Sequence, residues 1–345
     1  MTGASNENHW AELCLANMRE TVSLLAERAP LLAEMAEYHL GWTGELTRQD
    51  RYRGKMIRPM IAILSARAVG GETAAEAAVP LAAAIELLHN FTLIHDDIQD
   101  NSPSRRHRPT VWAKWGEAQA INAGDALFAA SHLALLHAAE RGVAPQVVID
   151  LIRGFDATTI EIVSGQVLDL QFEQRQDVSS AEYIEMITGK TARIVEFAAG
   201  GGAWIGGAGP DLSAHLAEFG LSLGLGFQVQ DDLLGTFGAA SDTGKAAADD
   251  IRRKKQSLPV LLLRQTAGPD DRERLAAIYH RPEIDPGAVA EVLELMGRHE
   301  IEAQVRETVT RYHDRAVSAL SATGLGEHAL GPLMDLTRRL ESRTA

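Results

Sequence analysis

Three carboxylates follow directly after an apolar segment in the first third of the chain. The sequence from Glu86 reads ELLHNFTLIHDDIQDNSPSRRHRPT, and its acidic residues are Asp96, Asp97 and Asp100. Residues four apart share a helix face, so Asp96 and Asp100 are expected to point the same way. At the negative end of the predicted helix, these carboxylates would repel one another without a cation. Because Mg²⁺ is commonly held by carboxylates together with water and substrate phosphates, we predict a divalent metal site.

A solvated acidic surface is the usual alternative for such a cluster. The segment leading into this one, residues 72–100, is largely apolar on all faces apart from its ends. A helix of that kind belongs in the middle of a bundle. The carboxylates are therefore assigned to the end of a buried helix, which Asn101, Ser102 and Pro103 are expected to terminate.

A second acidic cluster repeats this design. Gln228, Asp231 and Asp232 are spaced three and four residues apart and follow another apolar helical segment. One acidic pair after an apolar helix could be accidental, whereas two such pairs suggest opposite walls of one cavity. Metal ions between these walls would bind a polyphosphate ligand.

Basic residues that could bind such an anion are also present. Lys55 and Arg58 lie about one helical turn apart, and His89 lies two turns before Asp96 on nearly the same face. Taken singly, a basic side chain is usually a solvated surface charge, and a helical histidine is usually a core residue. Several of the basic residues stand beside glycine or proline, where a loop can present them to an anion. The other candidates are Arg105, Arg106, Lys190, Lys245 and Lys255.

The elements that position these residues are predicted to be helices. Hydrophobic residues make up 46% of the sequence and aromatic residues only 5%, so alanine and leucine dominate. Apolar residues recur every three or four positions almost throughout, and no sheet is predicted. Helices are expected over residues 10–40, 58–70, 72–100, 115–142, 144–175, 180–205, 210–238, 256–266, 286–309 and 311–322. The glycine-rich residues 198–209 lack the G-x-G-x-x-G pattern after a strand, so we predict close helix packing there.

Composition limits the partners and the location. The 345 residues carry a net charge of −14, and a protein this acidic is a poor general binder of nucleic acid or anionic membranes. The single cysteine, Cys14, excludes an internal disulfide and fits a reducing compartment. The N-terminal residues lack the pattern of a signal peptide, and no stretch is apolar enough to span a membrane. We therefore expect a cytoplasmic protein with a single domain, residues 1–345.

In its motifs, the sequence resembles the trans-isoprenyl diphosphate synthase, or polyprenyl synthetase, family over roughly residues 50–260. GKMIRP resembles the family's G-K-x-x-R-P, and DDIQD with the trailing RRHRPT resembles its first aspartate-rich motif. GQVLDL resembles the family's central G-Q-x-x-D motif, and GKTA resembles the K-T pair. FQVQDDLLG followed by GKAAADDIRRKKQSLP resembles the second aspartate-rich motif and its lysine segment. Five matches in the same order are not expected by accident.

The resemblance implies an all-α fold, a single large helical bundle of the isoprenoid synthase type around a deep central cavity, usually as a homodimer. It also implies Mg²⁺-dependent head-to-tail chain elongation, with three ions in each active site. In that reaction an allylic diphosphate (dimethylallyl, geranyl or farnesyl) ionises, isopentenyl diphosphate attacks the cation, and a proton is lost. Metal ions neutralise the leaving group, and a dry cavity keeps water from the cation.

The resemblance further implies roles for individual residues. The metal ligands would be Asp96, Asp97, Asp100 and Asp231. The catalytic residues would be Asp96, Asp100, Asp231 and Lys190. The allylic diphosphate would be bound by Arg105, Lys190, Gln228 and Lys245, with Thr191 and Lys255 as further substrate-binding residues. The isopentenyl diphosphate would be bound by Lys55, Arg58, His89 and Arg106.

Three positions depart from the family pattern. Gly235 stands where the second motif usually has an aspartate, so the third metal ion would depend on Asp231, water and Gln228. Met56 replaces a common arginine, and His107 stands where glycine is common. The fold expectation is unaffected by these changes.

The length of the product is predicted from the residue five positions before the first aspartate. That residue is Phe91, followed by the smaller Thr92, and it would help to form the floor of the cavity. One aromatic residue there resembles the geranylgeranyl (C20) type, whereas two adjacent aromatic residues would suggest C15. The alternative is that Phe91 is an ordinary core residue.

Two other functions use the same fold. A terpene cyclase would use the metals and the allylic substrate but not isopentenyl diphosphate, and the retained Lys55, Arg58, His89 and Arg106 argue against it. A non-catalytic regulatory subunit of a related synthase should have lost metal ligands, whereas five of the six usual acidic positions are kept.

Overall fold

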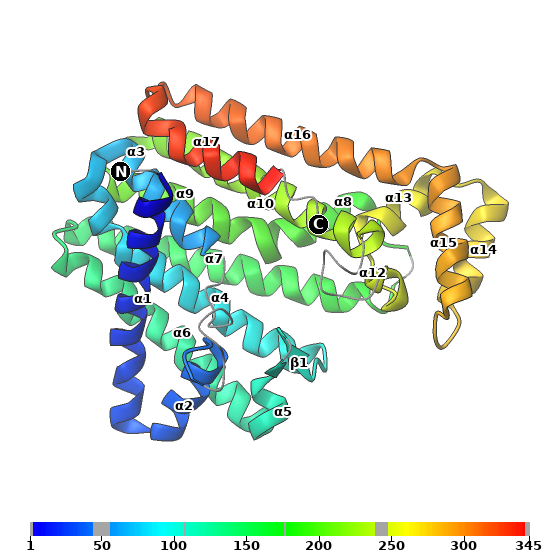
Figure 1. The fold of residues 1–345 in the computed structure, drawn as a ribbon, viewed down its shortest axis with the longest axis horizontal. Coiled ribbons are helices and arrows are strands. Elements are labelled where there is room, and N and C mark those ends of the chain that lie inside the picture. The colour runs from blue at the N-terminus through cyan, green and yellow to red at the C-terminus, as the bar shows by residue number, and fades with distance from the viewer. Residues whose placement is uncertain (1–2, 44–55, 107, 176, 239–247, 342–345) are drawn as a thin grey trace. The chain divides into compact units, whose positions relative to one another are not determined.

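The computed structural model describes residues 3–43, 56–106, 108–175, 177–238 and 248–341. Helices form almost all of this part of the protein (Figure 1), which confirms the all-α prediction. The described residues divide into two compact units. The first unit comprises Met1–Phe155 and Ala198–Ala214, and the second comprises Asp156–Phe197 and His215–Ala345. The expectation of a single domain over residues 1–345 stays a prediction.

The first unit is built from the N-terminal elements and a short hairpin. They are α1 (Gly3–Arg28), α2 (Pro30–His39), α3 (Ile57–Ala77), α4 (Val79–Gln99), β1 (Ser104–Arg105), β2 (Arg108–Pro109), α5 (Val111–Trp115) and α6 (Glu117–Glu140). The first part of α7 (Pro145–Phe172), the second part of α9 (Arg193–Ile205) and the start of α10 (Pro210–Phe237) complete it.

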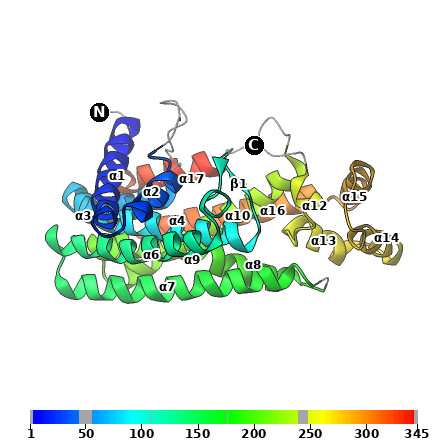
Figure 2. The same ribbon diagram turned by 90° about the horizontal axis from the view of Figure 1, so that it is seen from below.

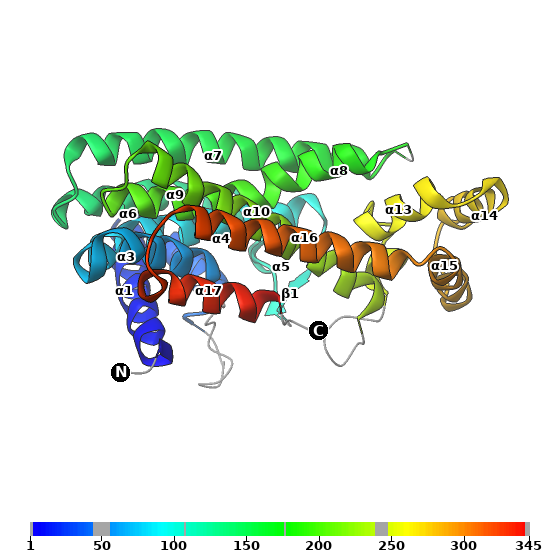
Figure 3. The same ribbon diagram turned by 90° about the horizontal axis from the view of Figure 1, so that it is seen from above.

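The second unit contains the remainder of α7, α9 and α10 and the C-terminal elements. The latter are α8 (Ser180–Ile187), the π-helix η1 (Thr188–Ala192), α12 (Asp249–Arg252), α13 (Leu258–Thr266), α14 (Pro269–Tyr279), α15 (Pro286–Arg298), α16 (Ile301–Ala322) and α17 (Glu327–Glu341). Figure 3 shows α17 alongside α16, and the two run antiparallel and in contact.

Helix α4 is the central helix of the first unit. Pro80 stands in its first turn, where a missing backbone N–H costs nothing. From Val79 to Leu88 every residue is buried, as expected for a helix that is apolar on all faces. Helix α4 packs along α6 (Figure 2), and Gly124 permits this contact because a β-carbon there would lie 2.3 Å from His95 Nε2. The predicted buried helix leading into the acidic cluster is thus confirmed.

The glycine-rich segment forms the second part of α9 and the turn after Ile205, and it packs against α3. A β-carbon on Gly202 would lie 2.2 Å from the carbonyl oxygen of Ala62, and one on Gly206 would lie 2.7 Å from Val69 Cβ. Such approaches are possible only for glycine. The prediction of close helix packing, rather than a nucleotide-binding loop, is confirmed.

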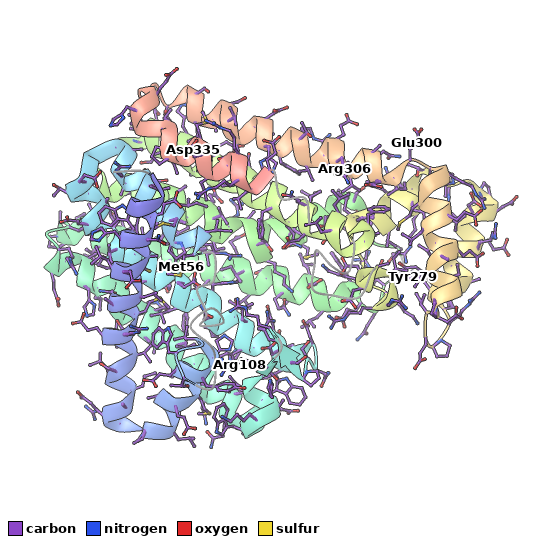
Figure 4. All side chains as sticks on the ribbon, in the orientation of Figure 1. Met56, Arg108, Tyr279, Glu300, Arg306 and Asp335 are labelled. Atoms are coloured by element: carbon purple, nitrogen blue, oxygen red, sulfur yellow. The ribbon has the colours of Figure 1, made fainter. Side chains whose placement is uncertain are left out.

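Some predicted boundaries are wrong. Residues 10–40 form two helices that break at Ala29, and residues 286–309 break at Glu300, which has a φ of 53° (Figure 4). Residues 180–205 are interrupted by η1, and the hairpin forms a two-residue ladder where no strand was predicted. Apolar periodicity continues across each of these helix breaks, because the same core is covered on both sides.

Among the described residues, no single helix is long and apolar enough to cross a membrane. Helices α3 and α4 pass that test only as a pair, and they are bent by 80° relative to each other.

Candidate active site

The first acidic cluster lies at the C-terminal end of α4, as predicted. The helix ends at Gln99, and Asn101 turns the backbone with a φ of 49°. Asp97 is buried, whereas Asp96 is half-buried and Asp100 is exposed. The three carboxylates therefore differ in exposure. Asp96 and Asp100, which lie one helical turn apart, are the two that solvent can reach.

Asp97 is bound by an arginine of the hairpin that follows. Arg105 Nε donates a hydrogen bond to Asp97 Oδ1 at 2.9 Å. Burial raises the pKa of Asp97 above its ordinary value, although the Arg105 guanidinium opposes that rise. No donor from the described part of the protein reaches Asp97 Oδ2, which is buried. This oxygen is suited to a cation that the protein alone does not supply.

Arginines and neutral histidines form a cluster in the first unit. Burial, with the positive charge of Arg58 and Arg106, lowers the pKa of His89 well below its ordinary value. Burial, with Arg105 and Arg106, lowers the pKa of His39 to about 3. Both imidazoles are thus neutral at pH 7, so they can donate hydrogen bonds without adding to the arginine charge. Several guanidinium groups beside neutral donors make a suitable site for a phosphate group.

Sequence reasoning missed His39. It is the last residue of α2, outside every motif, and the sequence carries no signal for its approach to the arginines. The charges of Arg58, Arg105 and Arg106 all act on His89, so the structure brings these four residues into one cluster. Their assignment to two different diphosphates stays a prediction. Lys55, Lys245 and His107 lie outside the described residues.

The G-Q-x-x-D motif and the K-T pair meet in the second unit. A β-carbon on Gly165 of α7 would lie 2.2 Å from the backbone nitrogen of Lys190, and one on Gly189 would lie 2.7 Å from the Glu161 carbonyl oxygen. The two backbones therefore touch. This contact places the Lys190 ammonium 2.5 Å from Asp169 Oδ2, where it donates a hydrogen bond.

The next residue connects the K-T pair to the second acidic cluster. Thr191 Oγ1 donates to Gln228 Oε1 at 3.0 Å, and Gln228 Nε2 donates to Asp232 Oδ1 at 3.2 Å. Thr191 and Asp232 are buried, and Gln228 is half-buried. These linked hydrogen bonds fix the rotamers of predicted substrate-binding residues.

Asp232 is fully buried, and its oxygens are occupied by protein donors. Besides Gln228, it accepts hydrogen bonds from Tyr183 Oη at 2.5 Å, Lys255 Nζ at 3.2 Å and the Leu258 backbone at 3.1 Å. Asp232, with Asp250 second, raises the pKa of Lys255, so the ammonium stays charged. Asp232 is therefore a structural carboxylate, and its half-buried neighbour Asp231 is the better metal-ligand candidate.

Position 235, where an aspartate is usual, is occupied by a neighbouring carboxylate. A β-carbon built on Gly235 would lie 2.5 Å from Asp250 Oδ2 and 2.7 Å from Asp250 Cγ. Asp250 is buried, and its Oδ2 lies 4.0 Å from Lys255 Nζ. Asp250 was not among the predicted site residues, although it stands in the lysine segment that was singled out.

Aromatic rings extend behind the first acidic cluster. Phe91 of α4 contacts Phe128 of α6 with 5.2 Å between ring centroids, and His132 follows at 4.8 Å from Phe128. Phe155 of α7 lies 5.1 Å beyond His132 and is fully buried. Thr92 Oγ1 donates to the His89 carbonyl, so its hydroxyl is satisfied within its own helix. Phe91, which also contacts the His95 ring at 4.8 Å, is thus part of a stack of rings (hereafter the aromatic stack: Phe91, Phe128, His132 and Phe155).

Magnesium fits this donor set. Within the described ranges, no group of three or more His, Cys, Asp or Glu residues is arranged to hold a metal ion. Mg²⁺ keeps several waters and binds one or two carboxylates together with substrate phosphates, so a few accessible carboxylates suit it. Asp96 and Asp100 in the first unit and Asp231 in the second would supply those carboxylates. The two clusters belong to different units, and two opposite walls of one cavity stay a prediction.

Comparison with known proteins identifies the family. The polyprenyl synthetase family model matches residues 45–296. The chain belongs to the polyprenyl synthetase family. It is therefore an enzyme of the prenyltransferase class, and members of this family use divalent metal ions.

Curated relatives in this family differ in the product they are named for. The chain is 35% identical to a (2E,6E)-farnesyl diphosphate synthase of Mycobacterium tuberculosis, over 94% of this chain and 90% of the relative. It is 38% identical to a geranylgeranyl diphosphate synthase of Saccharolobus solfataricus, over 83% and 82%. Membership of the family therefore does not determine the product.

Solved structures agree in fold. A polyprenyl synthetase from Streptomyces coelicolor A3(2) matches with a TM-score of 0.86 at 32% identity, over 96% of this chain and 98% of that one. A polyprenyl synthase from Caulobacter crescentus CB15, complexed with calcium and isoprenyl diphosphate, matches with a TM-score of 0.79 at 28% identity, over 98% of each chain.

Proposed function

We propose that the protein elongates prenyl chains head to tail, condensing isopentenyl diphosphate with an allylic diphosphate, and that its main product is geranylgeranyl diphosphate. The cluster of Arg58, His89 and Arg106 with His39 carries this proposal. This cluster gives the first unit a binding site for a second anion with several oxygens. A cyclase, which uses a single diphosphate substrate, has no need of it.

The proposed reaction is balanced without an added base. The allylic C1–O bond breaks, and diphosphate leaves with the electron pair. The terminal double bond of isopentenyl diphosphate then attacks the allylic C1, and the departing diphosphate accepts the proton that the new product loses. Bound Mg²⁺ would supply Lewis-acid neutralisation of the leaving group. Three ions would be held by Asp96, Asp97, Asp100 and Asp231.

The protein's own groups would orient the allylic diphosphate. Asp169 fixes the position of the Lys190 ammonium, and Gln228 fixes the Thr191 hydroxyl. Lys255 is oriented by Asp232, so it would act as a fixed positive charge. Preorganised charges cost little reorganisation when negative charge develops on the leaving oxygen. Arg105 and, outside the described residues, Lys245 would complete the allylic site, with Lys55 added to the isopentenyl site.

The aromatic stack supports the C20 product. Phe91 and Phe128 are half-buried, whereas Phe155 is fully buried, so the rings lead from the acidic end of α4 into the core. A growing prenyl tail would meet Phe91 first and the deeper rings afterwards. Side chains packed this closely stop an apolar tail by overlap, since protein cores leave few voids.

We also propose that the enzyme is a homodimer. In the second unit, Ile160, Val163 and Val167 form an exposed apolar stripe along α7, with Ile160 66% exposed. In the first unit, Leu133 and Leu136 of α6 are exposed as well. Apolar stripes of this kind usually mark a protein contact. Light scattering of the purified enzyme tests this: a monomer at micromolar concentration would contradict it. The expected cytoplasmic location stays a prediction.

One incubation tests the activity. The pure protein is mixed with MgCl₂, isopentenyl diphosphate and either the C5, C10 or C15 allylic diphosphate, and the products are identified after dephosphorylation. Geranylgeraniol as main product is expected. Farnesol as the end point, or products beyond C25, would contradict the C20 assignment. Hydrocarbons from an allylic substrate alone would indicate a cyclase, and no turnover would indicate a regulatory subunit.

A further inference from the structure

We propose that Tyr38 and Arg108 form a latch that holds the hairpin of Arg105 and Arg106 in its anion-binding conformation. The inference rests on the proposed function, in which this hairpin presents guanidinium groups to diphosphate. Neither residue belongs to the predicted binding set. Both act through the arginines they position.

The turn of the hairpin needs an external support. Ser104 pairs with Pro109 and Arg105 with Arg108. Arg106, which follows the first strand directly, has a φ of 53°, in the left-handed region. That conformation is unfavourable for a non-glycine residue, because its β-carbon crowds the following carbonyl oxygen. It persists only where surrounding contacts determine it, and a ladder of two residue pairs is too short to do so alone.

Arg108 ties the second strand to the end of α2. Its Nη1 donates to the Tyr38 carbonyl oxygen and its Nη2 donates to the Thr43 carbonyl oxygen, both at 3.2 Å. The two nitrogens of the guanidinium thus tie the carbonyl groups of Tyr38 and Thr43 to β2, the strand that pairs with Arg105. Figure 4 labels Arg108 at this position. A lysine could not make both contacts from one planar group.

Tyr38 contacts the same strand through its ring and its hydroxyl. The Arg108 guanidinium lies over the ring, 4.0 Å from its centroid, and Tyr38 Oη donates to the Pro109 carbonyl oxygen at 3.0 Å. Lys114 Nζ lies 4.3 Å from the same centroid, and Trp115 packs edge-on at 5.0 Å. Cation–π contacts of this kind are favourable at partly exposed sites. The ring is therefore the centre of the latch.

The latch lies where the anion site is assembled. His39, the residue after Tyr38, is influenced by the charges of Arg105, Arg106 and Arg108, so the end of α2 borders the arginine cluster. On the opposite strand, Arg105 is held by Asp97. The hairpin is thus fixed by Asp97 at the first strand and by the latch at the second, while Thr110 closes its base with hydrogen bonds to the Ser102 and Pro103 carbonyl oxygens. Arg106 stands between these two fixed points.

Four variants separate the parts of the latch. Tyr38→Phe removes only the hydroxyl contact, and Tyr38→Leu removes the ring face. Arg108→Lys keeps the charge and loses the forked contact. Arg153→Lys is the matched control, because Arg153 is an exposed arginine of the first unit, paired with Asp150 outside the cluster.

The first readout is binding of inorganic pyrophosphate in the presence of MgCl₂, by calorimetry. We expect Tyr38→Leu and Arg108→Lys to weaken it about tenfold, which corresponds to about 1.4 kcal/mol. The KM for isopentenyl diphosphate should rise by the same factor, while kcat changes less than about threefold. Tyr38→Phe and Arg153→Lys should stay within about threefold of the wild type in both measurements.

Unchanged pyrophosphate affinity in both Arg108→Lys and Tyr38→Leu would contradict the latch proposal. A lowered melting temperature without a change in affinity would contradict it as well, because the contacts would then serve stability alone. If Tyr38→Leu does not fold, Arg108→Lys decides alone. Failure of the proposed function is distinguishable, because it would show as wild-type protein that makes no elongated product. In that case, latch-dependent pyrophosphate binding would still support the inference.

Discussion

The carboxylate of Asp250 occupies the space that a side chain at Gly235 would need, with 2.5 Å between Asp250 Oδ2 and a β-carbon built on the glycine. The departure from the family motif at Gly235 therefore has a physical consequence in this protein. An aspartate at 235 and the present position of Asp250 exclude each other. Asp250 of α12, instead of a residue at the end of α10, is the second carboxylate beside Lys255, the partner of Asp232.

Gly235→Ala tests this relationship. We expect the free energy of unfolding to fall by about 1–3 kcal/mol, because the added methyl group overlaps a buried carboxylate. Gly297→Ala in α15 is the matched control, since a β-carbon there would meet nothing within 4 Å, and it should be neutral or slightly stabilising. Urea denaturation measures both. If Asp250→Gly does not reduce the cost of Gly235→Ala, the overlap is not the cause.

Asp231 and Asp232 should respond in opposite ways to the same substitution. Asp232→Asn should lower the free energy of unfolding by about 1–3 kcal/mol, since the buried donors Tyr183 Oη and Leu258 N lose part of their acceptor, while the Lys255 ammonium is partly exposed. Asp231→Asn should leave stability nearly unchanged and weaken Mg²⁺-dependent pyrophosphate binding. Urea denaturation and calorimetry on both variants measure these effects. The reverse pattern would show that Asp232 is the metal ligand.

His39 makes stability depend on pH. Its pKa is about 3 in the folded protein and about 6.5 when unfolded, so below pH 6.5 the unfolded state binds more protons. The contribution of His39 to the free energy of unfolding is therefore complete above about pH 6.5. It is lost progressively as the pH decreases toward 3. Between pH 6.5 and 5.5 this contribution is at most about 1.4 kcal/mol. Urea denaturation of the wild type and His39→Gln at pH 7.5 and 5.5 measures it. Equal losses in the two proteins would contradict it.

Shortening the aromatic stack should lengthen the product. Phe91→Ala removes the first phenylalanine ring of the stack, so products beyond C20 are expected. Phe128→Ala alone should change little, because Phe91 still blocks the approach, whereas the double variant should give longer products than Phe91→Ala. Chromatography of the dephosphorylated products measures the distribution. An unchanged distribution in Phe91→Ala would make that residue an ordinary part of the core.

Much of the site's location could be predicted from the sequence, but the partners of its residues could not. The apolar run into Asp96 and the breaker at Pro103 placed the first cluster correctly at the end of α4. The spacing of Gln228 and Asp232 likewise predicted a shared face, and the two are hydrogen-bonded. Both inferences use contacts within one helix, for which residue spacing is sufficient.

Contacts between segments that are distant in the sequence could not be predicted from residue spacing. Adjacent aspartates look alike in a sequence, yet the burial of Asp232 depends on Tyr183 and Lys255, which are far away in sequence. The approach of His39 to the arginines and the crowding at Gly235 arise in the same way. Helix breaks were also missed at Glu300, since a left-handed non-glycine residue leaves little trace in composition.

The π-helical turn of η1 has a consequence for the register of the K-T pair. A π-turn contains one residue more than an α-turn, and α8 and α9 flank it. Deleting one residue from Thr188–Ala192 would let the helices join as a continuous α-helix with little change in their angular phase, because the wider turn absorbs the extra residue. Lys190 would then leave Asp169, or Thr191 would leave Gln228, while the apolar faces lost only one position. The extra residue thus sets the direction in which the substrate-binding side chains point. A deletion at this turn would leave the fold intact and abolish catalysis.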